Sequence, residues 1–157
     1  MNIKKTILLF LALLLPVCIF VFLKFFGKNE FDVPAFYQQE KPVVPEDCSY
    51  SYAAPYLIPD SVMAHVKKDE KKALYLVHFS SPENLSRVVE NYGSEIDVVA
   101  DPNLADTRLR RCVFLMTESQ DMILIDNQKK IRGYYDSKDR EEIDRLLLEL
   151  DILLKKY

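Results

Sequence analysis

Three cysteines and two histidines are the side chains of this chain with the widest chemical scope. Cys18 lies inside an apolar run, which leaves Cys48 and Cys112 as the thiols of a folded domain. In an oxidising compartment two such thiols commonly form a structural disulfide. The sequence leaves two other interpretations open: separate thiols, with Cys112 buried as a small apolar residue, or a redox-active pair.

A metal site is the second chemistry to consider. Thiolates together with an imidazole suit copper(I), so Cys48, Cys112 and His78 are candidate ligands. Their wide separation gives no ligand spacing, however, and His78 lies in an apolar pattern typical of a core strand. His65 follows a polar pattern and is expected to be exposed. We therefore predict no cofactor and no metal, with copper at this set as the alternative.

Two clusters of charged residues are also candidate functional sites. Arg108, Arg110 and Arg111 could bind an anion or a partner, or could lie on a solvated turn. The acidic residues between Asp136 and Asp144 lie at the start of a predicted helix, where capping and the helix dipole explain them. No catalytic residue is predicted, and the chain is not expected to be an enzyme.

The N-terminus predicts a location. Residues 7–23 form an apolar run of 17 residues that comes after Lys4 and Lys5. About 20 residues cross a bilayer core, so a signal anchor is predicted over residues 1–26, with the rest outside the cytoplasm in the bacterial periplasm. The run lacks a signal-peptide cleavage site, and no small residue precedes Cys18 as lipidation would require.

The net charge excludes one class of partner. Beyond residue 26 the chain carries 18 basic and 24 acidic residues, a net charge of −6. Nucleic-acid binding requires a basic stripe, and none is present. The length after the anchor suits one modest core.

Residues 27–60 differ in composition from residues 61–157, and we call them the strap. They contain five of the eight prolines, with six aromatic residues between them. Proline at this density prevents helices and interrupts sheet ladders. The aromatic residues indicate that part of the strap packs as an extended segment on the domain over residues 61–157.

The order of predicted elements indicates an α/β fold with a mixed sheet and helices on both faces. Residues 73–79 read as a buried central strand and residues 95–100 as a second strand. An apolar stripe predicts a final amphipathic helix. The pattern gives a helix at 61–67, a helix from 80 to 92, an apolar run at 112–116, a hairpin at 123–136 and the last helix at 139–154.

Three segments resemble the Sco/SenC family of membrane-anchored, thioredoxin-fold proteins, which assist assembly of the copper centres of cytochrome oxidase. They are the strand end at 76–79, the Val-x-x-Asp-Pro segment at 98–102, and the hairpin with the final helix at 124–150. The resemblance covers about the last hundred residues. It implies a thioredoxin-like domain and a role in respiratory-complex assembly.

The copper-binding part of the family pattern is absent. The loop at 80–84 contains no cysteine, residues 117–121 contain no histidine, and no proline occurs after Pro102. Serine hydroxyls do not replace thiolates for copper(I). The resemblance therefore predicts a non-catalytic assembly factor with a protein partner in the envelope. The alternatives are a copper chaperone with an unconventional site, and a thiol-disulfide oxidoreductase that uses Cys48 and Cys112.

Overall fold

The computed structural model describes residues 3–26, 32–67, 71–79, 85–101, 104 and 106–155. The chain divides into two compact units, residues 1–31 and 32–157. The predicted start of the helix from 80 to 92 falls on residues 80–84, which lie outside the described residues.

The first unit contains helix α1 (Ile3–Phe26), which continues through Pro16. Leucine, isoleucine and phenylalanine dominate this segment, and Lys24 lies in its last turn. Within the described ranges, no helix combines the length and the apolar character needed to cross a membrane. The transmembrane span over residues 1–26 therefore stays a prediction from the sequence.

The second unit is built on a four-stranded mixed sheet, with strand order β2-β1-β3-β4. Strands β1 and β2 are parallel, whereas β3 is antiparallel to both β1 and β4. The prediction of an α/β fold with a mixed sheet is confirmed. The strands are β1 (Leu74–His78), β2 (Asp97–Val99), β3 (Met122–Asp126) and β4 (Ile131–Tyr135).

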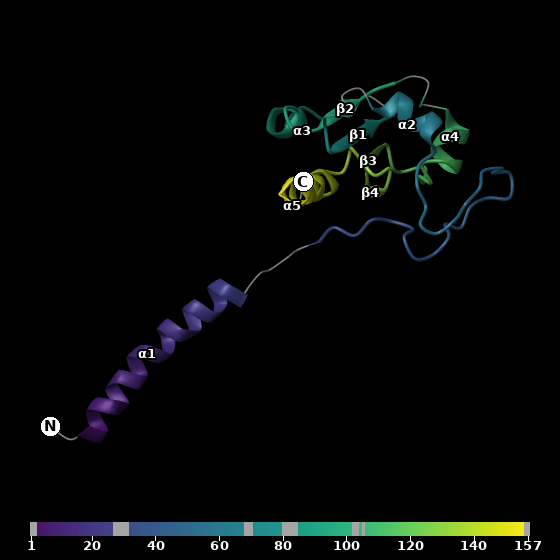
Figure 1. Ribbon diagram of the computed structural model, residues 1–157. Helices are drawn as coiled ribbons and strands as arrows, with labels where there is room; N and C mark the ends of the chain where they lie inside the picture. Colours follow the sequence, from purple (N-terminus) through teal and green to yellow (C-terminus); the bar gives the residue numbers. More distant parts are fainter. Residues whose placement is uncertain are drawn as a thin grey trace. The chain divides into compact units, whose positions relative to one another are not determined.

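Helices cover both faces of this sheet (Figure 1). Helices α3 (Leu85–Tyr92) and α5 (Arg140–Leu154) cover one face, and α2 (Asp60–Val66) and α4 (Thr107–Cys112) cover the other. Successive side chains of a strand point to opposite faces, so each strand supplies both cores. Strand β1 places Leu74 and Leu76 in the α3–α5 core and Tyr75 and Val77 in the other.

The described elements differ from the sequence expectations in three places. Helix α2 begins and ends one residue earlier than the predicted 61–67, with Pro59 as its N-cap. Strand β2 is shorter than predicted. Helix α4 was not predicted. It contains the basic cluster, for which a solvated turn was one expectation. The apolar run at 112–116 begins at the last residue of α4 and continues as backbone that is not a strand.

The described part of the strap, from residue 32 on, packs mainly on the α2–α4 face without forming a strand. Tyr56 and Ile58 are buried in that core, and Val33 is buried in the other. Backbone bonds fix it at two points: the Phe36 amide donates to the Ile131 carbonyl at 2.9 Å, and the Ile58 amide donates to the Lys129 carbonyl at 3.0 Å. Because β4 is an edge strand, the first contact also covers one of its free carbonyls.

Candidate functional site

The two thiols of the second unit form a disulfide. Cys48 in the strap is bridged to Cys112 at the end of α4, with the Cα atoms 5.4 Å apart. Cys112 is fully buried and Cys48 is half-buried. The predicted disulfide is confirmed. Neither sulfur is a free thiolate in this state, and thiolates are the form in which cysteine attacks disulfides or binds copper.

Two of the predicted arginines hold the strap beside this bridge. Asp106 caps α4 by accepting from the amides of Arg108 and Leu109. The Arg108 guanidinium donates to the Asp47 carbonyl at 3.3 Å, and the Arg111 guanidinium pairs with the Asp47 carboxylate. These contacts flank Cys48 on the chain, so charge and covalent bond fix the same short segment.

Arg110 lies on another side of α4. Its guanidinium donates to the Gln120 carbonyl at 2.7 Å and lies 5.1 Å from the centre of the Phe79 ring. The Phe79 amide in turn donates to the Asp121 carbonyl at 3.0 Å. Arg110 therefore lies where β1 ends and β3 begins, and the three arginines do not form one group.

Three tyrosines bind the end of α4, an arrangement that the sequence did not reveal. Their hydroxyls donate to three consecutive carbonyls: Tyr52 to Cys112 at 2.6 Å, Tyr56 to Val113 at 2.7 Å, and Tyr134 to Phe114 at 2.8 Å. The last carbonyls of a helix have no partner within it, so these bonds replace water. We call Tyr52, Tyr56 and Tyr134 the tyrosine clamp.

Burial sets the protonation state of the clamp. It raises the pKa of Tyr56 and of Tyr134 well above the usual value of 10, with neighbouring tyrosines adding to the shift. It also raises the pKa of Tyr52. A neutral hydroxyl is the form that donates a hydrogen bond, so the clamp is held in its donating state at neutral pH.

His78 and Cys112 are on opposite sides of the sheet. His78 shares its strand face with Leu74 and Leu76, which belong to the α3–α5 core, whereas α4 covers the other face. His65 is largely exposed, with its Nδ1 atom 3.6 Å from an Asp101 oxygen. Over the part of the chain that the structure describes, no three His, Cys, Asp or Glu side chains group closely enough to hold a metal ion.

The other predicted positions have structural roles or fall outside the described residues. Asp139 caps α5 by accepting from the Glu141 amide at 2.9 Å, and Asp136 accepts from the Lys138 amide at 2.9 Å. The loop at 80–84, where the family pattern would place its cysteines, lies outside the described residues.

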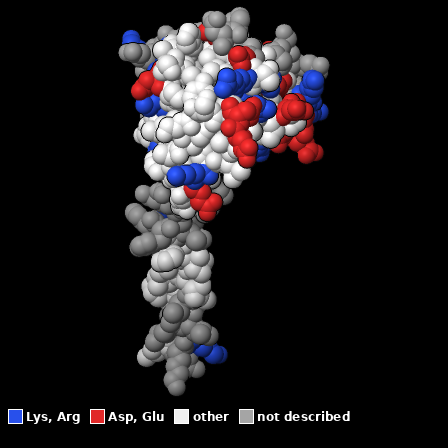
Figure 2. All heavy atoms as spheres, turned by 90° about the vertical axis from the view of Figure 1, so that its right-hand side faces the viewer, with Lys and Arg blue, Asp and Glu red and all other residues white. Residues whose placement is uncertain are grey.

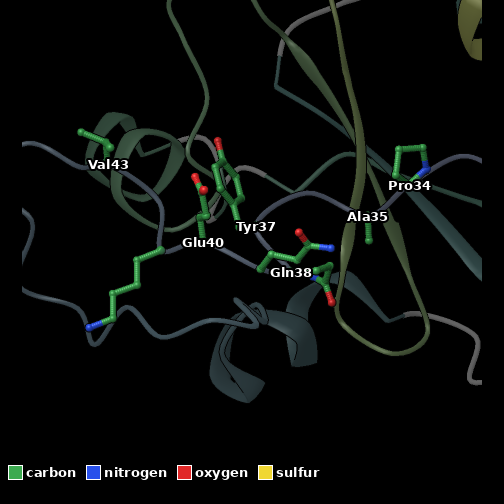
Figure 3. A pocket seen from close by; sticks show the side chains of 8 residues that line it. Pro34, Ala35, Tyr37, Gln38, Glu40 and Val43 are labelled. Atoms are coloured by element: carbon green, nitrogen blue, oxygen red, sulfur yellow. The ribbon is translucent and has the colours of Figure 1, made fainter.

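Two hollows of the second unit are lined by described residues. The larger, about 680 Å³, is lined by eight strap residues between Pro34 and Val43 (Figure 3). Pro34 and Val43 lie at opposite ends of this view, with Tyr37 and Glu40 between them. The smaller, about 210 Å³, joins α4 to the next segment of the chain, and we call it the arginine hollow. Its lining residues are Thr107, Arg110, Arg111, Met116, Thr117 and Glu118.

The second unit is thus a mixed α/β domain with a strap that a disulfide and two tyrosine hydroxyls attach to the end of one short helix. Comparison of the chain with protein-family models, with curated proteins and with solved structures finds no match.

Proposed function

We propose that this chain is a membrane-anchored, extracytoplasmic binding or assembly factor with a thioredoxin-like, Sco/SenC-like domain. It acts in the biogenesis of a respiratory complex such as cytochrome oxidase, at the bacterial inner membrane. The mixed sheet with a C-terminal hairpin and helix is consistent with this fold. The anchor is the apolar run at residues 7–23.

The bridge between Cys48 and Cys112 is the observation that carries the proposal. Disulfides persist in the periplasm and are rare in the cytosol, so the bridge favours an extracytoplasmic domain. It also occupies both thiols of the domain, and burial of Cys112 hinders attack on its sulfur. A binding role therefore fits better than an oxidoreductase or a copper chaperone.

The exposed surface of the strap supports a protein partner. Figure 2 shows a broad uncharged area beside side chains of both charges on one face of the molecule. The strap itself exposes large apolar side chains, and Val43 is 100% exposed. Phe36, Tyr50 and Leu57 are further large apolar side chains that the described part of the strap exposes. Exposed apolar side chains are typical of interaction surfaces where they form a contiguous patch.

Thiol trapping in cells tests the location. Cells that express the full chain are treated with acid to quench exchange, and the denatured chain is alkylated with a maleimide polymer. We expect one polymer, at Cys18, without reductant and three after reduction. A Cys18→Ser variant should take up none without reductant. If the Cys18→Ser variant takes up two polymers before reduction, Cys48 and Cys112 are reduced in cells, which would contradict the proposal.

A copper(I) titration tests the non-catalytic role. The full chain in a mild detergent is reduced and titrated with copper(I) against a competing chelator. We expect no copper to be retained. One retained equivalent that is lost in a Cys112→Ser variant would overturn the binding role in favour of a copper chaperone.

A further inference from the structure

The arginine hollow is lined by charged, polar and apolar residues. Arg110, Arg111, Thr107 and Thr117 line it together with Met116, which is only 6% exposed. Glu118 is its single carboxylate. Its volume of about 210 Å³ suits one side chain rather than a whole cofactor.

Arg110 is held in place for binding at this hollow. One guanidinium nitrogen donates to the Gln120 carbonyl at 2.7 Å, and the group lies over the Phe79 ring. The Nε atom is buried and has no hydrogen-bond partner among the described residues. A buried donor without a partner costs free energy, and a small shift of the side chain that lets Nε donate to a ligand in the hollow would remove that cost.

A strained turn brings the second wall of the hollow to Arg110. Leu115 has a φ of 57°, in the left-handed region that non-glycine residues seldom adopt. The chain reverses there, and the Met116 amide donates to the Arg110 carbonyl at 3.0 Å. Strain of this kind persists where the surrounding structure fixes it, often at binding sites.

The guanidinium of Arg110 favours an anionic ligand at the hollow. The hollow contains Arg110, Arg111 and Glu118, and residues 27–157 carry a net charge of −6. Arg111 is already paired with Asp47, whereas Arg110 has no ion pair among the described residues, so Arg110 is the cation left to meet a ligand. A planar carboxylate matches the fork of donors on a guanidinium, and such pairs are among the stronger hydrogen bonds in proteins.

We propose that the arginine hollow binds the carboxylate of an acidic side chain on the partner protein, with Arg110 as its main contact. The inference rests on the proposed function, because it names the chemistry by which the binding domain recognises that partner. Thr107 and Thr117 add hydroxyl donors at the rim, and Met116 contacts the methylene groups of the bound side chain.

The test is a nuclear magnetic resonance titration of the ¹⁵N-labelled full chain in a neutral detergent. The probes are two blocked tripeptides, Gly-Glu-Gly and Gly-Gln-Gly. We expect the glutamate peptide to shift the Arg110 Nε–H and Thr117 amide signals saturably, and to bind at least about tenfold more tightly than its glutamine twin. Equal binding of both peptides would overturn the proposal.

Three variants sharpen this test. Arg110→Gln should abolish the difference between the peptides, whereas Arg140→Gln, an exposed change on α5, should leave it intact. Glu118→Gln removes an exposed negative charge that repels the carboxylate of the peptide, so it should tighten binding of the glutamate peptide about twofold. This variant keeps the test informative even if Arg110→Gln perturbs the fold. Unchanged or weaker binding in Glu118→Gln contradicts the charge selection.

Inorganic phosphate is the competing probe. If phosphate shifts the Arg110 signal saturably and the glutamate peptide does not, the hollow binds phosphate rather than a carboxylate. That result would overturn the proposal. The outcome is separable from the proposed function. A chain that passes thiol trapping and the copper titration but ignores the glutamate peptide would keep its binding role and lose only this site.

Discussion

The two faces of the sheet are covered in different ways. On one face α5 places an aliphatic stripe, Ile143, Leu146, Leu150 and Leu153, against the strands, and all four are fully buried. On the other face the strap lies without a helical or strand ladder, so its attachment depends on a disulfide and on tyrosine hydroxyls. A helix satisfies its own backbone and needs only apolar contact, whereas an irregular segment must take polar partners from elsewhere.

Removing the disulfide should have the largest effect on stability. A Cys48→Ala/Cys112→Ala variant loses a cross-link between residues 64 positions apart, which is worth about 4 kcal/mol in the chain-entropy account. Urea unfolding of the oxidised full chain measures this loss. A loss smaller than about 1 kcal/mol would mean that the polar contacts alone hold the strap.

Truncating the aliphatic stripe should cost somewhat less. Leu150→Ala deletes a fully buried side chain of α5 and should lower the free energy of unfolding by about 3 kcal/mol. Leu148→Ala is the matched control, because Leu148 lies on the same helix and is 62% exposed. We expect its effect to stay within about 0.5 kcal/mol. Equal losses in the two variants would contradict the assignment of the core face of α5.

The tyrosine clamp should contribute less per residue. Tyr56→Phe leaves the Val113 carbonyl buried without its donor and should cost about 1–2 kcal/mol. Tyr52→Phe removes the corresponding bond at a half-buried position and should cost less. The shift in the urea midpoint measures both. A larger loss in Tyr52→Phe would show that burial does not set the strength of these bonds.

Alkaline pH should remove the contribution of Tyr92 to the contact between α3 and α5. Burial, the Tyr92–Asp151 hydrogen bond and nearby carboxylates raise the pKa of Tyr92 from 10 to about 12. The neutral hydroxyl is therefore favoured in the folded chain, and its contribution is complete below pH 10 and lost as pH rises to about 12. Unfolding measured across this window should show a shallower decline in Tyr92→Phe. An unchanged decline of stability with pH in Tyr92→Phe would show that Tyr92 does not contribute to the loss of stability in this window.

The elements that were predictable from the sequence are those with a clear apolar pattern. Strands β1 and β3 are continuous apolar runs, and the apolar stripe of α5 has the helical period of 3.6; both patterns depend only on neighbouring residues. Helix α4 has six residues, three of them arginine, and its apolar positions are too few to show a period. Only Asp106 marks its start.

The candidate site was predictable where chemistry limits the choices. Only two thiols lie outside the apolar run, so their pairing needed no spacing signal. The tyrosine clamp joins residues up to 60 positions apart, and hydroxyl-to-carbonyl bonds leave no pattern in the chain. The position of Arg110 depends on the strained turn at Leu115, a leucine where left-handed backbone would suggest glycine or asparagine.

The bridge between Cys48 and Cys112 also determines how the domain responds to mechanical force. A pull applied between Asp32 and the C-terminal end reaches Cys48 and crosses to Cys112 through the sulfur atoms, so the residues between them bear no tension. The two cysteines are 64 positions apart, and without the bridge the chain between them would extend by roughly 200 Å. Under stretching, the chain between the cysteines should therefore extend only after the disulfide is reduced. Strand β1 lies within this loop, so the applied force is not transmitted along its backbone.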